Sequence, residues 1–209
     1  MTDKKYQVLQ RETLFQGYFR VDRYHVQHER FDGTMGAPYT REVFDRCRHV
    51  AGILLYDPIE DMIVLVEQFR TGTLALGEDP WMTEVVLGMV DVGETIEQAA
   101  RREAKEEAGC DVLEIQKIFS FFDSPGGTTE HITLFAGRIH APKHGATGGL
   151  AHENEDIRVH VVPATAAIRM LFNNQFRDSQ TIIAMQWFAM HRTELRSRWM
   201  VSDVGAPLV

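Results

Sequence analysis

Three glutamates fall on one face of a predicted helix. Glu103, Glu106 and Glu107 stand three and four residues apart, a spacing that brings helical side chains within reach of one another. Like charges at this spacing destabilise a helix by about 0.2–0.5 kcal/mol per pair, so helix stability does not explain the pattern. Carboxylate oxygens suit Mg²⁺ or Mn²⁺, and the absence of Cys and His at ligand spacing disfavours zinc. We therefore expect a divalent-cation site here, with a solvated helix face as the alternative.

The negative charge of the chain is concentrated around these glutamates. The 209 residues carry 30 Asp and Glu against 22 Lys and Arg, a formal charge of −8. Nine acidic and three basic residues between Glu84 and Glu114 account for −6 of that total. Charge this dense needs compensation, and a bound divalent cation is one candidate. The acidic excess also argues against a nucleic-acid partner, because phosphate contacts need clustered Lys and Arg.

The spacing around the glutamates matches a known motif. From Gly88 to Cys110 the chain reads Gly-x5-Glu-x7-Arg-Glu-Ala-x-Glu-Glu-x-Gly-Cys, the pattern of the Nudix box. The chain thus resembles the Nudix hydrolases, which cleave a nucleoside diphosphate linked to another group. The one departure is Cys110, where the family prefers an aliphatic residue. The resemblance implies that the three glutamates and the main-chain carbonyl of Leu87 bind metal, and that Arg102 pairs with Glu94 to orient the box.

Two features beyond the box resemble the ADP-ribose pyrophosphatase branch of this family. Pro125 follows Cys110 by 15 residues, a proline position that marks the branch. Residues 149–156, Gly-Leu-Ala-His-Glu-Asn-Glu-Asp, are similar to its mobile catalytic loop. In that loop the resemblance implies that Glu153 is the general base and that Glu155 is a further metal ligand. The alternative for so short an acidic stretch is an exposed turn.

Four more residues match substrate-binding positions of the branch. Arg41 and Arg70 match the arginines that hold the diphosphate, with a surface ion pair as the alternative for each. Tyr18 matches an aromatic residue that stacks on adenine, although an aromatic residue in a strand is usually part of the core. Glu130 matches a residue near the substrate ribose.

The resemblance implies a Mg²⁺-dependent hydrolase that converts ADP-ribose to AMP and ribose 5-phosphate. Two or three metal ions are expected, and Mn²⁺ can substitute for Mg²⁺. The main alternative is a hydrolase of another nucleoside diphosphate sugar such as GDP-mannose, since that relative shares the Ser-Pro-Gly-Gly turn. A non-catalytic ADP-ribose sensor is disfavoured, because all three box glutamates are present and no span remains for a DNA-binding domain.

The helix that must position the glutamates has clear ends in the sequence. Thr95 with Gln98 three residues later fits a capping box, so the helix is expected to begin at Ile96. Gly109 follows Ala108 as a C-terminal stop.

Apolar runs with turn signals between them predict the rest of the core. Asp32-Gly33 predicts a turn between two extended runs within residues 12–45, and residues 144–154 are expected to be flexible. Residues 71–79 follow no pattern. Strands are predicted at 50–56, 62–69, 81–90 with a break at Gly88, 115–122, 132–139 and 158–162, and further helices at 164–172 and 179–191. The expected fold is α+β: a Nudix fold with a mixed sheet flanked by helices in an α/β/α sandwich, preceded by a β-rich arm.

The N-terminal arm, residues 1–47, is predicted to act with a partner, and residues 48–209 are predicted to form the hydrolase domain. Some 45 residues of strand-like chain are too few to bury their own apolar face. In the family that the chain resembles the arm exchanges between subunits, which implies a domain-swapped homodimer. Two cysteines without C-x-x-C spacing, a charged N-terminus and no long apolar run favour the cytoplasm and argue against a membrane partner.

Overall fold

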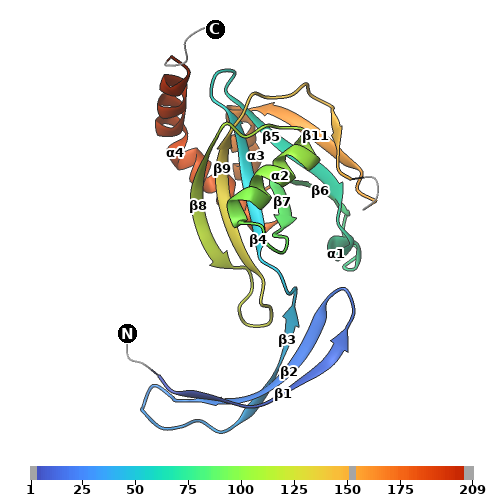
Figure 1. The fold of residues 1–209 in the computed structure, drawn as a ribbon, viewed down its shortest axis with the longest axis vertical. Helices are drawn as coiled ribbons and strands as arrows, with labels where there is room; N and C mark the ends of the chain where they lie inside the picture. Colours follow the sequence, from blue (N-terminus) through green and yellow to red (C-terminus); the bar gives the residue numbers. More distant parts are fainter. Residues whose placement is uncertain (1–3, 151–153, 205–209) are drawn as a thin grey trace. The chain divides into compact units, whose positions relative to one another are not determined.

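The computed structural model describes residues 4–150 and 154–204, so the predicted general base Glu153 lies outside the described residues (Figure 1). The chain forms two compact units. The first consists of Met1–His49 and Phe121–His131, and the second of Val50–Ser120 and Ile132–Val209. None of the described helices has the length and apolar character needed to cross a membrane.

The first unit is built on a three-stranded antiparallel sheet. Its strands β1 (Tyr6–Gln16), β2 (Arg20–His28) and β3 (Tyr39–Asp45) pair in chain order. The predicted Asp32-Gly33 turn is confirmed between β2 and β3, with Gly33 at φ 84°. The first strand begins at Tyr6, six residues before the predicted start, and is exposed along its whole length.

A hairpin loop distant in sequence completes the first unit. Phe44 of β3 donates its N–H to the carbonyl of Gly127 at 2.8 Å, and Thr129 donates back to the carbonyl of Phe44 at 3.0 Å. This pairing places Phe121–His131, which includes the turn that follows Pro125, against β3.

The second unit contains a mixed sheet. Its strand order is β10-β11-β5-β4-β9-β8, with β6 paired to β5 and β7 paired to β4. The β4 and β9 strands run parallel, whereas β4 pairs antiparallel with β5 and β7. The strands are β4 (Val50–Asp57), β5 (Met62–Phe69), β6 (Trp81–Glu84), β7 (Val86–Met89), β8 (Glu114–Phe122), β9 (His131–Arg138), β10 (Thr147–Gly148) and β11 (Ile157–Pro163).

Helices cover both faces of this sheet, as Figure 1 shows. The β4 strand is buried at every position. Ile53 and Leu55 point to the core beneath helix α2 (Ile96–Ala108), whose alanines pack in the same cluster. The alternate residue Tyr56 packs its ring on Phe188 and Trp199 of helix α4 (Ser179–Val204). The expected α+β class with layered helices is confirmed, and α3 (Ala164–Phe172) packs beside α4.

The predicted break of the 81–90 run at Gly88 is wrong. The run divides at Val85, where the chain leaves β5 as its partner and joins β4. The Val85 N–H lies outside the ladder and donates to the Thr181 hydroxyl at 2.9 Å. A side chain from a distant helix therefore accepts the main-chain N–H that the strand break leaves without a ladder partner. No local sequence pattern could indicate this contact.

Two short elements and one helix end also differ from the sequence prediction by more than a residue or two. Residues 71–79 contain a short helix, α1 (Thr71–Leu74), and the stretch expected to be flexible contains β10. The last helix continues thirteen residues beyond the predicted end at 191, to Val204. Its extension is held by buried Leu195 and Trp199, and by Arg192, which pairs with Asp61.

Candidate active site

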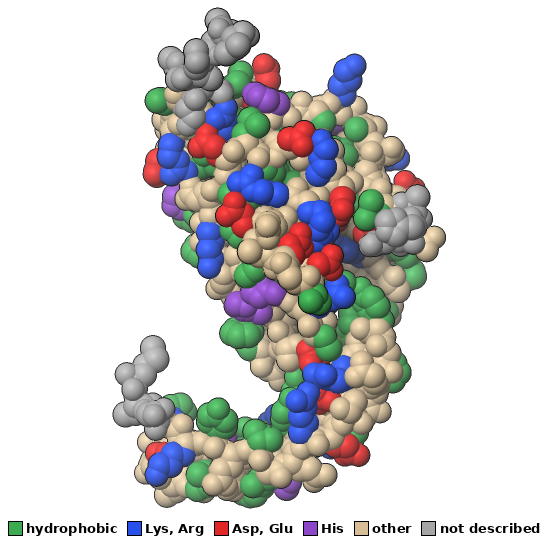
Figure 2. All heavy atoms as spheres, viewed as in Figure 1, with side chains coloured by type: hydrophobic (Ala, Val, Ile, Leu, Met, Phe, Trp, Pro, Cys, Tyr) green, Lys and Arg blue, Asp and Glu red, His purple; other side chains and the backbone are tan. Residues whose placement is uncertain are grey.

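The glutamates are positioned by α2, whose predicted ends are confirmed. The Gln98 N–H donates to the Thr95 hydroxyl at 3.2 Å, and the Thr95 N–H donates to the Gln98 side chain at 2.8 Å. Gly109 ends the helix in the left-handed conformation at φ 67°. Figure 2 shows acidic and basic side chains interleaved on the face of the second unit that α2 occupies.

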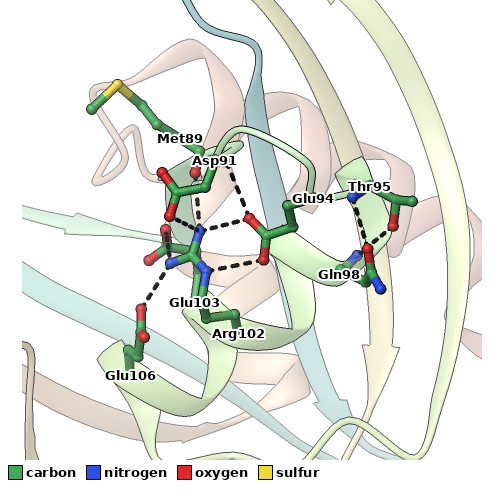
Figure 3. A network of polar contacts seen from close by, with 8 residues as sticks. All are labelled: Met89, Asp91, Glu94, Thr95, Gln98, Arg102, Glu103 and Glu106. Carbon is green, nitrogen blue, oxygen red and sulfur yellow. Dashed lines mark hydrogen bonds and ion pairs between the residues drawn. The ribbon is translucent and has the colours of Figure 1, made fainter.

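Arg102 organises the box through a network of ion pairs (Figure 3). Its Nε and Nη2 donate to the two oxygens of Glu94 at 3.0 and 3.1 Å, which confirms the predicted pair. Nη2 also donates to the Met89 carbonyl at 3.0 Å. Nη1 donates to Glu103 at 2.7 Å and to Glu106 at 2.8 Å. One guanidinium thereby ties the loop before α2 to two of the three glutamates.

Glu103 lies over the backbone of Gly88. A Cβ at Gly88 would stand 1.9 Å from the Glu103 carboxyl carbon, so only glycine leaves room for this carboxylate. Burial raises the pKa of Glu103 to about 7, against the pull of Arg102, and the charges of Glu106 and Glu155 add to the rise. The Glu103 carboxylate is thus close to its titration point at neutral pH.

Glu107 is the most buried of the three glutamates, with 3% of the residue exposed. Its Oε2 is buried and has no hydrogen-bond partner among the described residues. Burial raises its pKa well above the usual range, and the charges of Glu103 and Glu155 raise it further, whereas Arg70 and a backbone hydrogen bond from Leu87 lower it. Glu103, Glu107 and Glu155 therefore lie within electrostatic reach of one another, and Leu87 contacts Glu107 through its N–H rather than through the carbonyl predicted as a metal ligand.

These groups fit a divalent cation. An unpartnered carboxylate oxygen in a buried site is costly, and a hard cation would satisfy it. The pKa values of Glu103 and Glu107 are raised by burial first and then by neighbouring carboxylate charges, and a bound positive charge would offset both. Within residues 4–150 and 154–204, no group of three or more His, Cys, Asp or Glu side chains is arranged closely enough to hold a metal ion as it stands. Arg102 holds Glu106 and Glu103, so a cation would compete with this arginine for them.

The start of the acidic loop is anchored to the end of α2. Gly149 donates its N–H to the Glu106 carbonyl at 2.9 Å, and Leu150 donates its N–H to the Glu155 carboxylate at 3.2 Å. A Cβ at Gly148 would stand 1.9 Å from the Glu107 carbonyl oxygen, so β10 approaches the helix closely. Both described ends of the loop, 149–150 and 154–156, are therefore held near the glutamates.

Arg70 also belongs to the second unit. Its Nε and Nη2 lie 2.9 and 2.8 Å from one oxygen of Glu84, whose side chain is only 5% exposed. Sequence reasoning did not single out Glu84 as a partner of Arg70. The available signal was a single carboxylate inside the apolar run 81–90.

The other three predicted substrate residues lie in the first unit. Tyr18 is 75% exposed and contacts Phe19 edge to face, so the core alternative is wrong for it. Arg41 is exposed and lies over the Tyr39 ring at 4.7 Å. Glu130 accepts a hydrogen bond from Arg46 at 2.8 Å.

The shifted pKa of Glu103 predicts a pH-dependent stability of the metal-free protein. The pKa of about 7 in the folded protein exceeds the ordinary glutamate pKa of 4.5, so the folded state retains the proton to higher pH. Stability from this group is present at low pH and lost as the pH rises through 4.5 to about 7. As the pH rises from 4.5 to about 7, the free energy of unfolding of Glu103→Gln should therefore increase relative to that of the parent. Below and above this pH range the difference between the two proteins should stay constant. Urea unfolding in EDTA at pH 4 to 8 measures this, and a pH-independent difference would contradict it.

Comparison with known proteins agrees with this geometry. The family model of the NUDIX domain matches residues 46–191. An ADP-ribose pyrophosphatase of Escherichia coli K12 is 40% identical over 193 residues, 92% of each chain. One from Haemophilus influenzae is 36% identical over 92% of this chain and 90% of its own length.

Two further relatives widen the comparison. A GDP-mannose pyrophosphatase of Yersinia enterocolitica is 35% identical over 90% of this chain and 96% of its own length. A solved structure described as an ADP compounds hydrolase aligns with a TM-score of 0.66 at 16% identity, covering 91% of this chain and 98% of its own. At that identity the structural match is a likeness of fold.

Proposed function

The chain belongs to the Nudix hydrolases, in the branch of the ADP-ribose pyrophosphatases, and on that premise we propose that it hydrolyses ADP-ribose to AMP and ribose 5-phosphate. The observation that carries the proposal is the buried, unpartnered carboxylate oxygen of Glu107 beside Glu103 and Glu155. A cluster of this kind is suited to chemistry on a diphosphate, whose charge must be neutralised before water attacks phosphorus.

We propose that Glu103, Glu106, Glu107, Glu155 and the Leu87 carbonyl hold two or three Mg²⁺ ions, for which Mn²⁺ can substitute. A cation held there would supply positive charge against the diphosphate oxygens and would make water a stronger nucleophile at neutral pH. The hard oxygen donors and their burial support this assignment. Arg102 would hold the loop and helix of the Nudix box in place while Glu103 and Glu106 contact both this arginine and the metal.

The remaining roles are assigned to residues of both units. Glu153 is proposed as the general base that takes the proton of the attacking water. Arg41 and Arg70 are proposed to bind the diphosphate, Tyr18 to stack on the adenine and Glu130 to contact the ribose. The exposure of Tyr18 supports its role, because a stacking ring must present a free face.

A substrate panel tests the proposed function. The protein is incubated with Mg²⁺ and ADP-ribose, GDP-mannose or other nucleoside diphosphate sugars, and the products are identified. We expect AMP and ribose 5-phosphate in equal amounts, with the highest kcat/KM for ADP-ribose. No AMP release with either Mg²⁺ or Mn²⁺ would refute the proposal.

Hydrolysis of another nucleotide sugar is the second candidate. The Yersinia enterocolitica GDP-mannose pyrophosphatase, 35% identical over 90% of this chain, supports it. ADP-ribose pyrophosphatase relatives that are 36–40% identical over 92% of this chain favour ADP-ribose. A larger kcat/KM for GDP-mannose in the same panel would establish this alternative.

We propose that residues 1–47 form a dimerisation arm, exchanged between subunits, and that residues 48–209 form the hydrolase domain. The arm has an unusually exposed strand, with apolar Tyr6, Val8 and Phe15 of β1 all at the surface. A second copy of the chain would bury them. Light scattering at working concentration should therefore give about twice the chain mass of 23.9 kDa, and a monomeric mass would contradict the dimer.

A cytoplasmic location is proposed from the cysteines. Cys47 and Cys110 are both free, the first exposed and the second buried. Unpaired thiols suit a reducing compartment. No nucleic-acid or membrane partner is proposed, and the acidic charge of −8 agrees with a small-molecule substrate.

A further inference from the structure

We propose that Glu84, supported by Asp178, is a positioning residue that holds the Arg70 guanidinium away from Glu107. This keeps Arg70 available for the substrate diphosphate and leaves the Glu107 carboxylate available for a divalent cation. The inference rests on the proposed function for the part that concerns the substrate. The part that concerns the cation stands on the Arg70–Glu84 contact and on the charges of Asp178 and Glu107 near Arg70.

The Arg70–Glu84 contact fixes the guanidinium in one orientation. Two of its nitrogens, Nε and Nη2, lie 2.9 and 2.8 Å from Glu84 Oε2, so the edge that they share faces Glu84. Glu84 itself is 5% exposed and sits at the end of β6, where its backbone is fixed by pairing with Val66. With 37% of its side chain exposed, Arg70 retains access to a ligand, and its Nη1 is the donor group left over for diphosphate oxygens.

Asp178 adds a second carboxylate behind the pair. Its Oδ1 accepts the N–H of Thr181 at 2.7 Å at the start of α4, and its Oδ2 is buried without a hydrogen-bond partner among the described residues. Asp178 and Arg70 each shift the pKa of the other, so the two charges interact. Burial raises the pKa of both Glu84 and Asp178, as expected for carboxylates withdrawn from water toward one cation.

The backbone around the pair is also anchored. The Arg70 N–H donates to the Pro80 carbonyl at 2.8 Å, and Arg177 donates to the carbonyls of Asp79 and Trp81 at 2.8 and 3.0 Å. These bonds tie the segment after Arg70 to the residue preceding Asp178. The Arg70 main chain and the Arg177 side chain are therefore both held against residues 79–81, which lead into the strand that carries Glu84.

Glu107 is the competing partner for Arg70. Arg70 lowers the pKa of Glu107 and Glu107 raises that of Arg70, so the guanidinium lies within electrostatic reach of the cation-site carboxylate. Glu107 also has a buried oxygen without a partner. If Glu84 were absent, the guanidinium would pair with Glu107, since a buried carboxylate binds a nearby cation strongly. Arg70 would then block the site that it borders.

A double-mutant cycle tests this proposal. Mn²⁺ binding is measured by calorimetry without nucleotide for the parent, Glu84→Ala, Arg70→Ala and the double variant. We expect Glu84→Ala to weaken Mn²⁺ binding by about tenfold or more in the parent, because Arg70 takes Glu107. In the Arg70→Ala background the same change should have no such effect. An equal loss in both backgrounds, or no loss in either, would overturn the proposal.

The substrate arm of the test uses kinetics. Glu84→Ala should lower kcat/KM for ADP-ribose by about a hundredfold through misplacement of Arg70, mainly in KM at saturating Mg²⁺. The near-isosteric Glu84→Gln keeps a hydrogen-bond acceptor but removes the charge, so its kcat/KM should lie between those of the parent and Glu84→Ala. If the alanine variant does not fold, the glutamine variant replaces it in the test. If the parent protein does not hydrolyse ADP-ribose, the proposed function fails, but the Mn²⁺ cycle still decides the positioning role.

Asp61→Asn is the matched control. Asp61 is a partly buried carboxylate of the same unit that pairs with Arg192 and accepts a hydrogen bond from Tyr56 at 2.8 Å. Its left-handed backbone, φ 57°, is one that Asn tolerates. The control should lose thermal stability but keep the parent's Mn²⁺ affinity and KM. If Asp61→Asn changed these two quantities as much as Glu84→Ala, the effect would be one of general structure, and the proposal would be refuted.

Discussion

Glu107→Gln is expected to lower kcat/KM for ADP-ribose by about a thousandfold, since metal-assisted charge stabilisation contributes several kcal/mol and each 1.36 kcal/mol changes a rate tenfold. Glutamine keeps the size of the side chain and removes the negative charge. The buried Oε2 of Glu107 has no hydrogen-bond partner among the described residues, so a cation would satisfy it. AMP release at saturating Mg²⁺ measures the effect.

The same substitution should leave the metal-free protein folded and no less stable. Burial and the charges of Glu103 and Glu155 already raise the pKa of Glu107 well above its usual range. A neutral amide therefore avoids the cost of a buried charge at pH 7. Thermal unfolding in EDTA tests this, and it separates loss of catalysis from loss of fold.

Glu97→Gln is the control for the Glu107 experiment. Glu97 is on the same helix, but it is exposed and pairs with Arg101 at 3.0 Å in an i,i+4 arrangement. A surface pair of this kind contributes about 0.3–0.5 kcal/mol, so activity should stay close to the parent. Undiminished activity of Glu107→Gln, or an equal loss in Glu97→Gln, would refute the metal-binding role of Glu107.

Local sequence rules predicted the helix that carries the box. The Thr95–Gln98 capping box and the Gly109 stop operate within one turn of the helix ends, and both are present in the structure. The Arg102–Glu94 pair followed from the family resemblance and is likewise present. These features depend on neighbours in sequence or on a dense motif, so tertiary contacts do not override them.

Features set by distant contacts could not be predicted. The break at Val85 depends on Thr181, which lies 96 residues away in sequence, and the Arg46–Glu130 pair joins residues 84 apart. Glu84 looked like one more acidic residue in an acidic region, because its burial and its pairing with Arg70 appear only in the folded chain. Sequence spacing reports which side chains share an element, whereas burial and pairing depend on how elements pack.

Gly88→Ala is the second large expected effect. The backbone of Gly88 is not in the left-handed region, so alanine is compatible with its conformation. Its Cβ, however, would stand 1.9 Å from the Glu103 carboxyl carbon and would displace that carboxylate. A shift of about 1 Å in a positioned group can cost about a hundredfold in rate, and we expect a loss of that size in kcat/KM.

The Gly88 variant separates position from charge, because it keeps all three glutamates and moves only one. The atoms that must move belong to a flexible side chain, so we expect the fold to persist with little change in Tm. Gly72→Ala is the matched control, since a Cβ there meets nothing within 4 Å and Gly72 lies in α1. Parent-like activity in Gly88→Ala would mean that the position of Glu103 over Gly88 is not needed for the reaction. A loss that exceeds the control and leaves Tm unchanged would show that the glycine is required to place Glu103.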